Sequence, residues 1–493
     1  MKKHLFILLV ICGALNAQPP RSFYATYGGT GEDIAYGVKE AYSMHYGIIG
    51  STASFGYGNN DMYLILIDSL GRGIWQKSYG GPGNEIGKSL VYNPADSGFV
   101  LVGYSNSYGN GGYDIYVVRT NKNGEIIWQK NYGGSDWDFG YDLAFSSDGH
   151  LLICGYAENS TYGKQDAVVM KVNSADGALI WQKTFGGTGD DKLTSIFIHT
   201  NQDIYLSGST TSYGDVNGDI YILKTNANGD SLSSIIYGGN LTDKANDIIV
   251  NSLGNIVICG GSESFSNGKM DAFFSEFSGN GQLNWKKNFG YSGFDEEAFK
   301  IVYAPTAAAG GTFISIYTTN EIASNGKDFK TIYLTYSGDF YGGGYSGSFG
   351  FSKDEETFDL IATSDKGFAQ VGYTQSFGNN GSEILFVKQD SLLYRGTSIV
   401  GVQKNESRSN KISLFPNPTK LEGGKKVLKV AGSDISIIEV CVLNSVGTKI
   451  LQPEIISVAK ETVTFDVSEL LPGCYNVWVK KEDEVVWFKL IVD

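Results

Sequence analysis

Charged residues and proline are scarce in this chain of 493 residues, at 18% and nine residues. Disordered chains need high charge and few aromatic residues, and the 31 tyrosines and 27 phenylalanines here exclude that class. The 65 glycines do not recur at every third position, which excludes a collagen helix. The net charge of −14 makes a phosphate-neutralising surface, and hence nucleic acid as a partner, unexpected. The composition indicates an all-β protein with many tight turns.

Long apolar runs are missing except near the N-terminus. Lys2 and Lys3 precede a short apolar stretch that ends in small residues up to Ala17, which is the order of a secretory signal peptide. The stretch is too short to cross a bilayer. No later segment has 18 consecutive apolar residues, so no transmembrane segment is predicted. We expect residues 1–17 to be removed on the way to the periplasm.

Motifs for catalysis are also missing. The chain has no H-E-x-x-H, G-x-S-x-G or phosphate-loop sequence and no C-x-x-C spacing, so no catalytic residue is assigned. Cys154 and Cys259 fall at equivalent places of a repeat and are expected to be buried apolar groups. Cys441 and Cys474 are the pair that a disulfide could join.

A repeat of about 52 residues occupies positions 21 to 395. Its clearest copies contain Trp-Gln-Lys-Asn-Tyr-Gly-Gly at 128–134 and Trp-Gln-Lys-Thr-Phe-Gly-Gly at 181–187. Each copy divides into four short apolar runs, the pattern of a β-propeller blade. We therefore predict a seven-bladed β-propeller over residues 18–400. The tight Asp-Gly and Asn-Gly turns are expected on one face of the propeller. The longer loop between the second and third runs and the loop between blades are expected on the other, called the long-looped face below. The first glycine of each copy, called the anchor glycine below, is Gly28, Gly80, Gly133, Gly186, Gly238, Gly290 or Gly350.

The two ends of the repeat region complement each other. The last copy lacks a fourth strand, and the chain starts with an unassigned strand at 23–27. Pairing that strand into the seventh blade would close the ring and remove a free sheet edge. Tryptophans 75, 128, 181 and 285, each five positions before an anchor glycine, are expected to dock the outer strands.

Two acids recur in every copy. Five positions after each anchor glycine stands Asp33, Glu85, Asp138, Asp191, Asp243, Asp295 or Glu355, and the third strand starts with Asp61, Asp114, Asp166, Asp219, Asp271, Asp328 or Glu383. The favoured interpretation is structural, with each carboxylate accepting amide hydrogens of its own loop. Calcium is the alternative, and Asp215, Asn217 and Asp219 form a weak candidate site with D-x-N-x-D spacing. No other cofactor is expected.

Aromatic residues in the long loops are the candidates for ligand binding. Trp137 and Phe294 stand where other copies have small or polar residues, and Tyr108, Tyr162 and Tyr213 belong to a recurrent Ser/Thr-aromatic-Gly motif. Rings beside carboxylates suit the stacking and hydrogen bonding of sugars. Covering a neighbouring loop is the alternative role for these rings.

The composition changes after residue 400. Residues 401–411 form a polar linker, and 412–493 have the strand pattern of a small antiparallel β-sandwich. This module resembles the C-terminal sorting domain of type IX secretion substrates, type A, also called the Por secretion tail. The matching residues are Pro416, Asn417, Pro418, Gly447, Gly473, Tyr475 and Lys489. The resemblance implies interaction with the type IX secretion machinery and a place outside the cell or on the outer-membrane surface.

The repeats resemble those of secreted bacterial β-propeller-repeat proteins, through W-x-K-x-[YF]-G-G and D-x-[YF]-[VI] motifs over residues 21–395. That family implies no catalytic residue for this chain. We therefore expect a monomeric, non-enzymatic binding protein that holds a glycan or a surface protein at its long-looped acidic face. A secreted polysaccharide hydrolase or lyase is the alternative.

Overall fold

The computed structural model of the protein divides the chain into one compact unit over Pro19–Gln403 and a second that includes Lys404–Asp493. It describes residues 22–398 and 413–492, except for 159–163, 252, 267, 305–312, 320–325, 341–345, 378–380, 391–396, 423–424, 432–438, 444–448, 452–454, 460–461, 467, 469–472 and 482–483. The predicted signal peptide (residues 1–17), Tyr162 and Gly447 lie outside these ranges.

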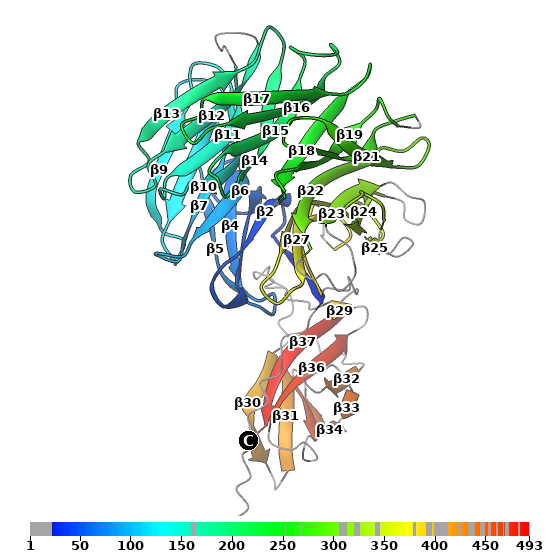
Figure 1. The fold of residues 1–493 in the computed structure, drawn as a ribbon. Coiled ribbons are helices and arrows are strands. Elements are labelled where there is room, and N and C mark those ends of the chain that lie inside the picture. Colours follow the sequence, from blue (N-terminus) through cyan, green and yellow to red (C-terminus); the bar gives the residue numbers. More distant parts are fainter. Residues whose placement is uncertain are drawn as a thin grey trace, which may run out of the picture. The chain divides into compact units, whose positions relative to one another are not determined.

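The first unit is the predicted seven-bladed propeller (Figure 1). Six blades are four-stranded sheets whose strands follow chain order. Blade one contains β2 (Asp33–Glu40), β3 (Tyr46–Thr52), β4 (Asp61–Ile67) and β5 (Gly73–Tyr79). Blade two contains β6 (Glu85–Asn93), β7 (Gly98–Ser105), β8 (Asp114–Thr120) and β9 (Ile126–Tyr132). Blade three contains β10 (Asp138–Phe145), β11 (Leu151–Glu158), β12 (Gln165–Val172) and β13 (Leu179–Phe185). Blade four contains β14 (Asp191–Ile198), β15 (Ile204–Thr210), β16 (Asp219–Thr225) and β17 (Ser231–Tyr237). Blade five contains β18 (Asp243–Val250), β19 (Ile256–Ser262), β20 (Asp271–Phe277) and β21 (Leu283–Phe289). Blade six contains β22 (Glu297–Tyr303), β23 (Phe313–Thr319), β24 (Asp328–Leu334) and β25 (Ser346–Phe349).

The seventh blade combines both ends of the repeat region, which confirms the predicted closure. Its strands are β26 (Glu355–Ala362), β27 (Phe368–Thr374), β28 (Glu383–Gln389), β1 (Phe23–Tyr27) and β29 (Thr397–Ser398). Strand β1 pairs antiparallel with β28 over its whole length, from Phe23 opposite Lys388 to Tyr27 opposite Ile384. The ring is therefore closed by main-chain hydrogen bonds between segments about 360 residues apart.

The position of each strand in its blade explains its composition. The second and third strands are covered on both faces by neighbouring blades, so they are apolar without alternation. Strand β4 (Asp-Met-Tyr-Leu-Ile-Leu-Ile) is buried at every position. The outermost strand β5 keeps one face toward solvent and buries only Tyr79. Apolar clusters between successive blades form the core, and the one joining blades one and two contains Ile49, Leu64 and Leu101.

The four outer-strand tryptophans dock the first, second, third and fifth blades on the blade that follows each. A Cβ atom built on Gly124, in the tight turn of blade two, would lie 2.8 Å from the indole of Trp75 in blade one. Tyr79 of the same outer strand donates its hydroxyl hydrogen to the carbonyl of Gly124 at 2.7 Å. Equivalent turn glycines contact Trp128, Trp181 and Trp285. The predicted docking role of these tryptophans is confirmed.

Helical structure in the described ranges is limited to the 3-10 turn η1 (Tyr42–Met44). Within the same ranges, no helix is long and apolar enough to cross a membrane. Cys154 and Cys259 are free and buried, as predicted, and burial raises the pKa of both thiols.

The second unit contains two antiparallel four-stranded sheets. One orders β30 (Ser413–Glu422), β31 (Lys425–Ala431), β35 (Thr462–Asp466) and β34 (Ile455–Ala459), and the other orders β33 (Lys449–Leu451), β32 (Glu439–Leu443), β36 (Gly473–Lys481) and β37 (Glu484–Val492). The segment 416–419, with two prolines, is skipped in the β30–β31 pairing, which suits residues without an amide hydrogen. Gly473 and Tyr475 start β36, and Lys489 lies in β37 opposite Asn476.

The register of this sheet excludes the Cys441–Cys474 disulfide that the sequence left open. Cys441 pairs with Trp478, four residues along β36 from Cys474. Four residues of strand span about 13 Å, whereas disulfide-bonded Cα atoms lie within about 7 Å.

We predict that Phe23→Ala lowers the free energy of unfolding by about 3–5 kcal/mol, because it removes a buried ring from the closing strand. Phe23 is 1% exposed, and its ring centre lies 5.7 Å from that of Phe386. Leu232→Ala, on an outer strand at 53% exposure, is the control and should change stability by less than about 0.5 kcal/mol. Urea unfolding followed by fluorescence measures both, and equal effects would contradict the closing role of β1.

Candidate functional site

The acids that follow the anchor glycines are buried and hydrogen-bonded inside their own loops. The carboxylate of Asp191 accepts hydrogen bonds from the amide of Gly187 at 2.9 Å and from the hydroxyls of Thr210 and Ser212. This arrangement recurs at Asp33, Glu85, Asp243 and Glu355. The structural interpretation of this ring of acids is therefore confirmed.

The sixth blade differs from the prediction by one residue. The side chain of Asp295 is 61% exposed and forms an ion pair with Lys269 at 3.4 Å. The buried place in the ring belongs to Glu296, which accepts a hydrogen bond from the hydroxyl of Thr319 at 3.2 Å and from the amide of Tyr291 at 3.3 Å. Asp295 was the wrong assignment, because the loop before this blade contains one extra residue.

The two rings of acids approach each other across the anchor glycines. A Cβ atom built on Gly133 would lie 2.2 Å from Asp114 Oδ1 and 2.6 Å from Asp138 Oδ2, so only glycine fits between them. Burial raises the pKa of Asp138 to about 6. The hydrogen bond from the Gly134 amide lowers this pKa, and the negative charges of Asp114 and Asp136 raise it further.

The tyrosines of the recurrent Ser/Thr-aromatic-Gly motif hold neighbouring loops together by hydrogen bonds. Tyr108 donates its hydroxyl hydrogen to the carbonyl of Gly80 at 2.8 Å, and Tyr213 does the same to Gly186 at 2.7 Å. Both acceptors are anchor glycines. These contacts support the loop-covering alternative for Tyr108 and Tyr213.

Trp137 and Phe294 lie in the loops of different blades. Trp137 is 49% exposed and is the outer member of a chain of rings. Its ring centre lies 6.0 Å from that of Phe139, which lies 4.9 Å from Tyr156, which lies 5.8 Å from Tyr141. Phe294 is half-buried. Trp137 thus connects, through packed rings, the long-looped face with the central channel.

The weak calcium candidate is a loop closed by its own hydrogen bonds. Asp219 accepts the amide hydrogen of Asp215 at 2.7 Å, and the side-chain amide of Asn217 donates to Asp215 at 2.9 Å. The described residues contain no group of three or more His, Cys, Asp or Glu side chains placed to hold a metal ion. Calcium binding stays a prediction.

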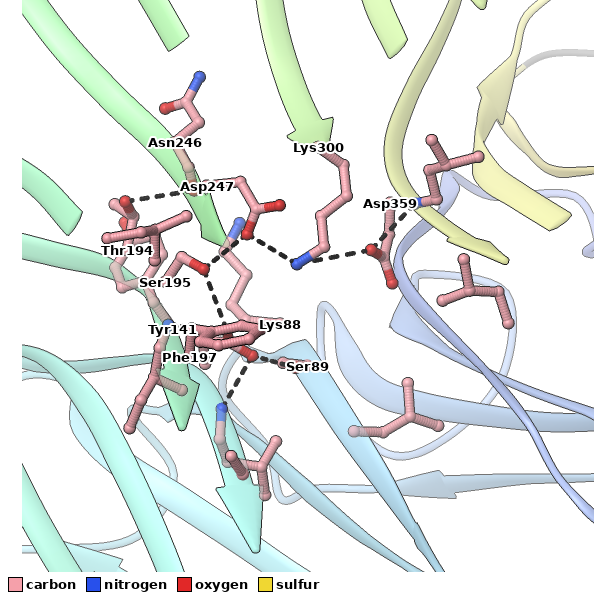
Figure 2. A pocket seen from close by; sticks show the side chains of 18 of the residues that line it. Lys88, Ser89, Tyr141, Thr194, Ser195, Phe197, Asn246, Asp247, Lys300 and Asp359 are labelled. Carbon is pink, nitrogen blue, oxygen red and sulfur yellow. Dashed lines mark hydrogen bonds and ion pairs between the residues drawn. The ribbon is translucent and has the colours of Figure 1, made fainter. Parts of the chain in front are cut away.

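A cavity of about 670 Å³ occupies the central channel, lined by the first strands of all seven blades (Figure 2). Each of these strands contains a β-bulge, at which one residue is skipped in the pairing with the second strand. A Cβ atom on Gly50, opposite the bulge of β2, would lie 1.9 Å from the carbonyl oxygen of Ile34, so the bulge requires that glycine. The skipped residues, called the bulge ring below, all line the cavity: Tyr36, Lys88, Tyr141, Thr194, Asn246, Phe299 and Phe358.

A polar network follows the bulge ring by one residue (Figure 2). Ser89 donates to Asp142 at 2.7 Å, and Ser195 donates to Asp247 at 2.6 Å. Three aspartates also bind the first strand of the next blade around the ring. The pairs are Asp142 with the Ile196 amide at 3.1 Å, Asp247 with the Ile301 amide at 3.0 Å and Asp359 with the Val38 amide at 2.8 Å. The network therefore joins the inner strands of different blades, including the first and the last.

Lys300 connects two of these aspartates. Its Nζ lies 2.9 Å from Asp247 Oδ1 and 4.0 Å from Asp359 Oδ1. Burial alone would lower the pKa of Lys300, but the nearby carboxylates of Asp247, Asp359 and Asp142 outweigh burial and raise it well above its usual value. Lys300 is therefore a charged structural member of the network.

The cavity has an aromatic side and a polar side. Tyr36, Phe299 and Phe358 are in ring contact, with Tyr36 stacked on Phe358 at 5.3 Å. Thr194 and Asn246, on the other side, hydrogen-bond to the inner strand of the next blade. The lining continues to the ends of the first strands, as far as Phe145, Ile198 and Ile361. The cavity thus extends toward the short turns and away from the long-looped face.

The sequence analysis missed this site. The bulge ring lies eight positions after the anchor glycine, or nine in the sixth copy, and the network lies one position later. A usable signal was present, because Asp142, Asp247 and Asp359 stand at equivalent positions of their first strands, each followed by apolar residues.

Comparison with known proteins identifies the second unit. Residues 413–493 match the secretion system C-terminal sorting domain, and residues 100–126 match a beta-propeller domain of unknown function (DUF5122). No curated protein is significantly similar in sequence. Among solved structures, the quinohemoprotein alcohol dehydrogenase of Comamonas testosteroni is 11% identical (TM-score 0.40; 91% of this chain and 76% of that one covered). A puromycin hydrolase is 10% identical (TM-score 0.48; 85% and 62% covered). At these values the likeness indicates neither a substrate nor a reaction.

The chain is thus a seven-bladed β-propeller protein with a C-terminal sorting domain. That domain is the Por secretion tail, and the protein is exported by the type IX secretion system to the cell surface or beyond it.

We predict that Asp138→Asn raises stability at pH 7 and leaves it unchanged near pH 4. The folded-state pKa of Asp138, about 6, exceeds the usual 3.8, so its stabilising contribution is complete below pH 4 and is lost as the pH rises through 6. After a discount for solvent screening, the shift corresponds to about 1–2 kcal/mol. Urea unfolding of both proteins between pH 4 and 7.5 measures the difference, and a gap that did not widen with pH would contradict this account.

We predict that Lys300→Met lowers the free energy of unfolding by about 3–5 kcal/mol, because it leaves buried carboxylates without their cation. The double variant Lys300→Met, Asp359→Asn should recover part of that loss. Lys287→Met is the control, since it breaks an exposed ion pair with Asp339 (2.6 Å), worth at most about 1 kcal/mol. Equal losses at the two lysines would show that the network does not stabilise the ring.

Proposed function

We propose that this exported propeller is a non-enzymatic binding protein that accepts a saccharide ligand in its central channel. One observation leads to this proposal. The seven first strands bring their bulge ring together around a cavity of about 670 Å³, with rings on one side and hydrogen-bonding groups on the other. Ligand sites in proteins typically combine an apolar wall with a few convergent polar groups.

The chemistry of the lining suits a sugar. The faces of Tyr141, Phe299 and Phe358 can pack against the C–H faces of a sugar ring. The carboxylate of Asp359 accepts the amide hydrogens of Val38 and Leu360 and keeps further lone pairs that can accept hydrogen bonds from sugar hydroxyls. We therefore propose the channel as the ligand site, whereas the sequence favoured the long-looped face.

The non-enzymatic part of the proposal is supported by how the channel carboxylates are held. Glycoside cleavage commonly uses one carboxyl group as an acid and a second as a base or nucleophile on opposite sides of the bond. Here Asp142 accepts hydrogen bonds from Ser89 and the Ile196 amide, and Lys300 bridges Asp247 and Asp359. Carboxylates fixed in a structural network are poorly suited to exchange protons with a substrate.

We predict that the purified full-length chain retains one class of oligosaccharide on a glycan array and that Tyr141→Ala weakens this binding about tenfold, or about 1.4 kcal/mol. Tyr57→Ala, at 93% exposure, is the control and should have no effect. Calorimetry measures the affinities, and circular dichroism verifies folding of the variants. Loss of binding with Trp137→Ala but not with Tyr141→Ala would place the site on the long-looped face. New reducing ends in the incubated saccharide would favour the hydrolase or lyase.

A further inference from the structure

Lys88 is the one cation of the bulge ring. The six equivalent positions hold tyrosine, phenylalanine, threonine or asparagine, so the repeat itself does not need a charge there. The Lys88 Nζ lies 3.8 Å from the centre of the Tyr36 ring and 5.5 Å from that of the Tyr141 ring. The rings of two neighbouring blades therefore hold the ammonium in the wall of the cavity.

The charge of Lys88 has no counter-ion among the residues that the structure describes. Its only recorded contacts there are the two tyrosine rings, and Figure 2 draws no hydrogen bond or ion pair from it. Burial lowers the pKa of Lys88 to about 8, because surrounding protein atoms shield the ammonium from bulk water even though part of the side chain faces the cavity. Buried charges in proteins are normally paired.

Lys300, another lysine of the channel, differs from Lys88 because it has counter-ions. Lys300 lies in the polar network, where Asp247 and Asp359 neutralise it. Asp142, in the strand next to Lys88, accepts hydrogen bonds from Ser89 and the Ile196 amide and forms no ion pair with Lys88. Three lysines line the cavity of this acidic protein: Lys39 is exposed, Lys300 is neutralised by the fold, and Lys88 is the one that an incoming anion could neutralise.

We propose that Lys88 binds the carboxylate of an acidic saccharide, which enters the channel with this group between Tyr36 and Tyr141. The proposal rests on the saccharide function proposed above and specifies its ligand class. A carboxylate at this point would supply the missing counter-ion, and the flanking rings would pack against the sugar that bears it. The other charges of the cavity are compatible with an anionic ligand. Lys39 adds another positive charge to the lining, and the carboxylates of Asp247 and Asp359 are engaged in the polar network.

The test compares matched ligands on the full-length protein. The probes are galacturonate, glucuronate and sialic acid oligosaccharides, each paired with the same oligosaccharide after reduction of its carboxyl groups. Wild-type protein should bind an acidic member at least tenfold more tightly than its neutral partner. Lys88→Met should abolish this preference, whereas Lys88→Arg should retain it to within about threefold. Lys183→Met, on the outer strand β13 and paired with Asp230, is the control and should change nothing.

The outcomes separate this inference from the proposed function. If Lys88→Met and wild type bind the acidic members equally, or wild type does not distinguish the members of a pair, the role of Lys88 is overturned while channel binding stands. If Tyr141→Ala weakens neither member, the channel proposal fails and this inference fails with it. Retained binding of the neutral members by Lys88→Met would exclude misfolding as the reason for its lost preference, and a retained preference in Lys88→Arg would assign the effect to the charge.

Discussion

The pairing of β1 with β28 is the contact on which the propeller depends, because it turns a row of seven blades into a ring. Each blade is apolar on both faces and needs a neighbour on each side. Without the closing strand, the seventh blade would expose an unpaired edge and the first blade an apolar face. The Val38–Asp359 hydrogen bond closes the same ring at its inner rim.

Closure also creates the channel. The inner edges of the first strands have no neighbouring strand to pair with. Aspartate side chains of the polar network accept hydrogen bonds from amides on these edges instead. The bulges direct one residue of each blade into the space that is left. These residues are free to vary because they do not build the blades, and a binding surface can therefore differ among propellers with the same scaffold.

The sequence predicted the scaffold well, for reasons visible at single residues. The anchor glycines recur in all seven copies and the tryptophans in four, because the blades meet their neighbours in the same way and the same local contacts are repeated. The prediction failed where one copy departs from the rest. Asp295 occupies the expected position, but an extra loop residue moves Glu296 into the buried place, and only the packing distinguishes two adjacent acids.

What the sequence by itself determined was the repeat, its division into four strands, the closure and the secretion tail, because turn chemistry, apolar runs and linear motifs are local properties of the chain. Only the tertiary structure decided the candidate site. Lys88, Tyr36 and Tyr141 are separated by about one repeat each, and nothing local relates them. They meet because bulged strands converge on one axis. Lys88 has no counter-ion there among the described residues, and this follows from the tertiary structure.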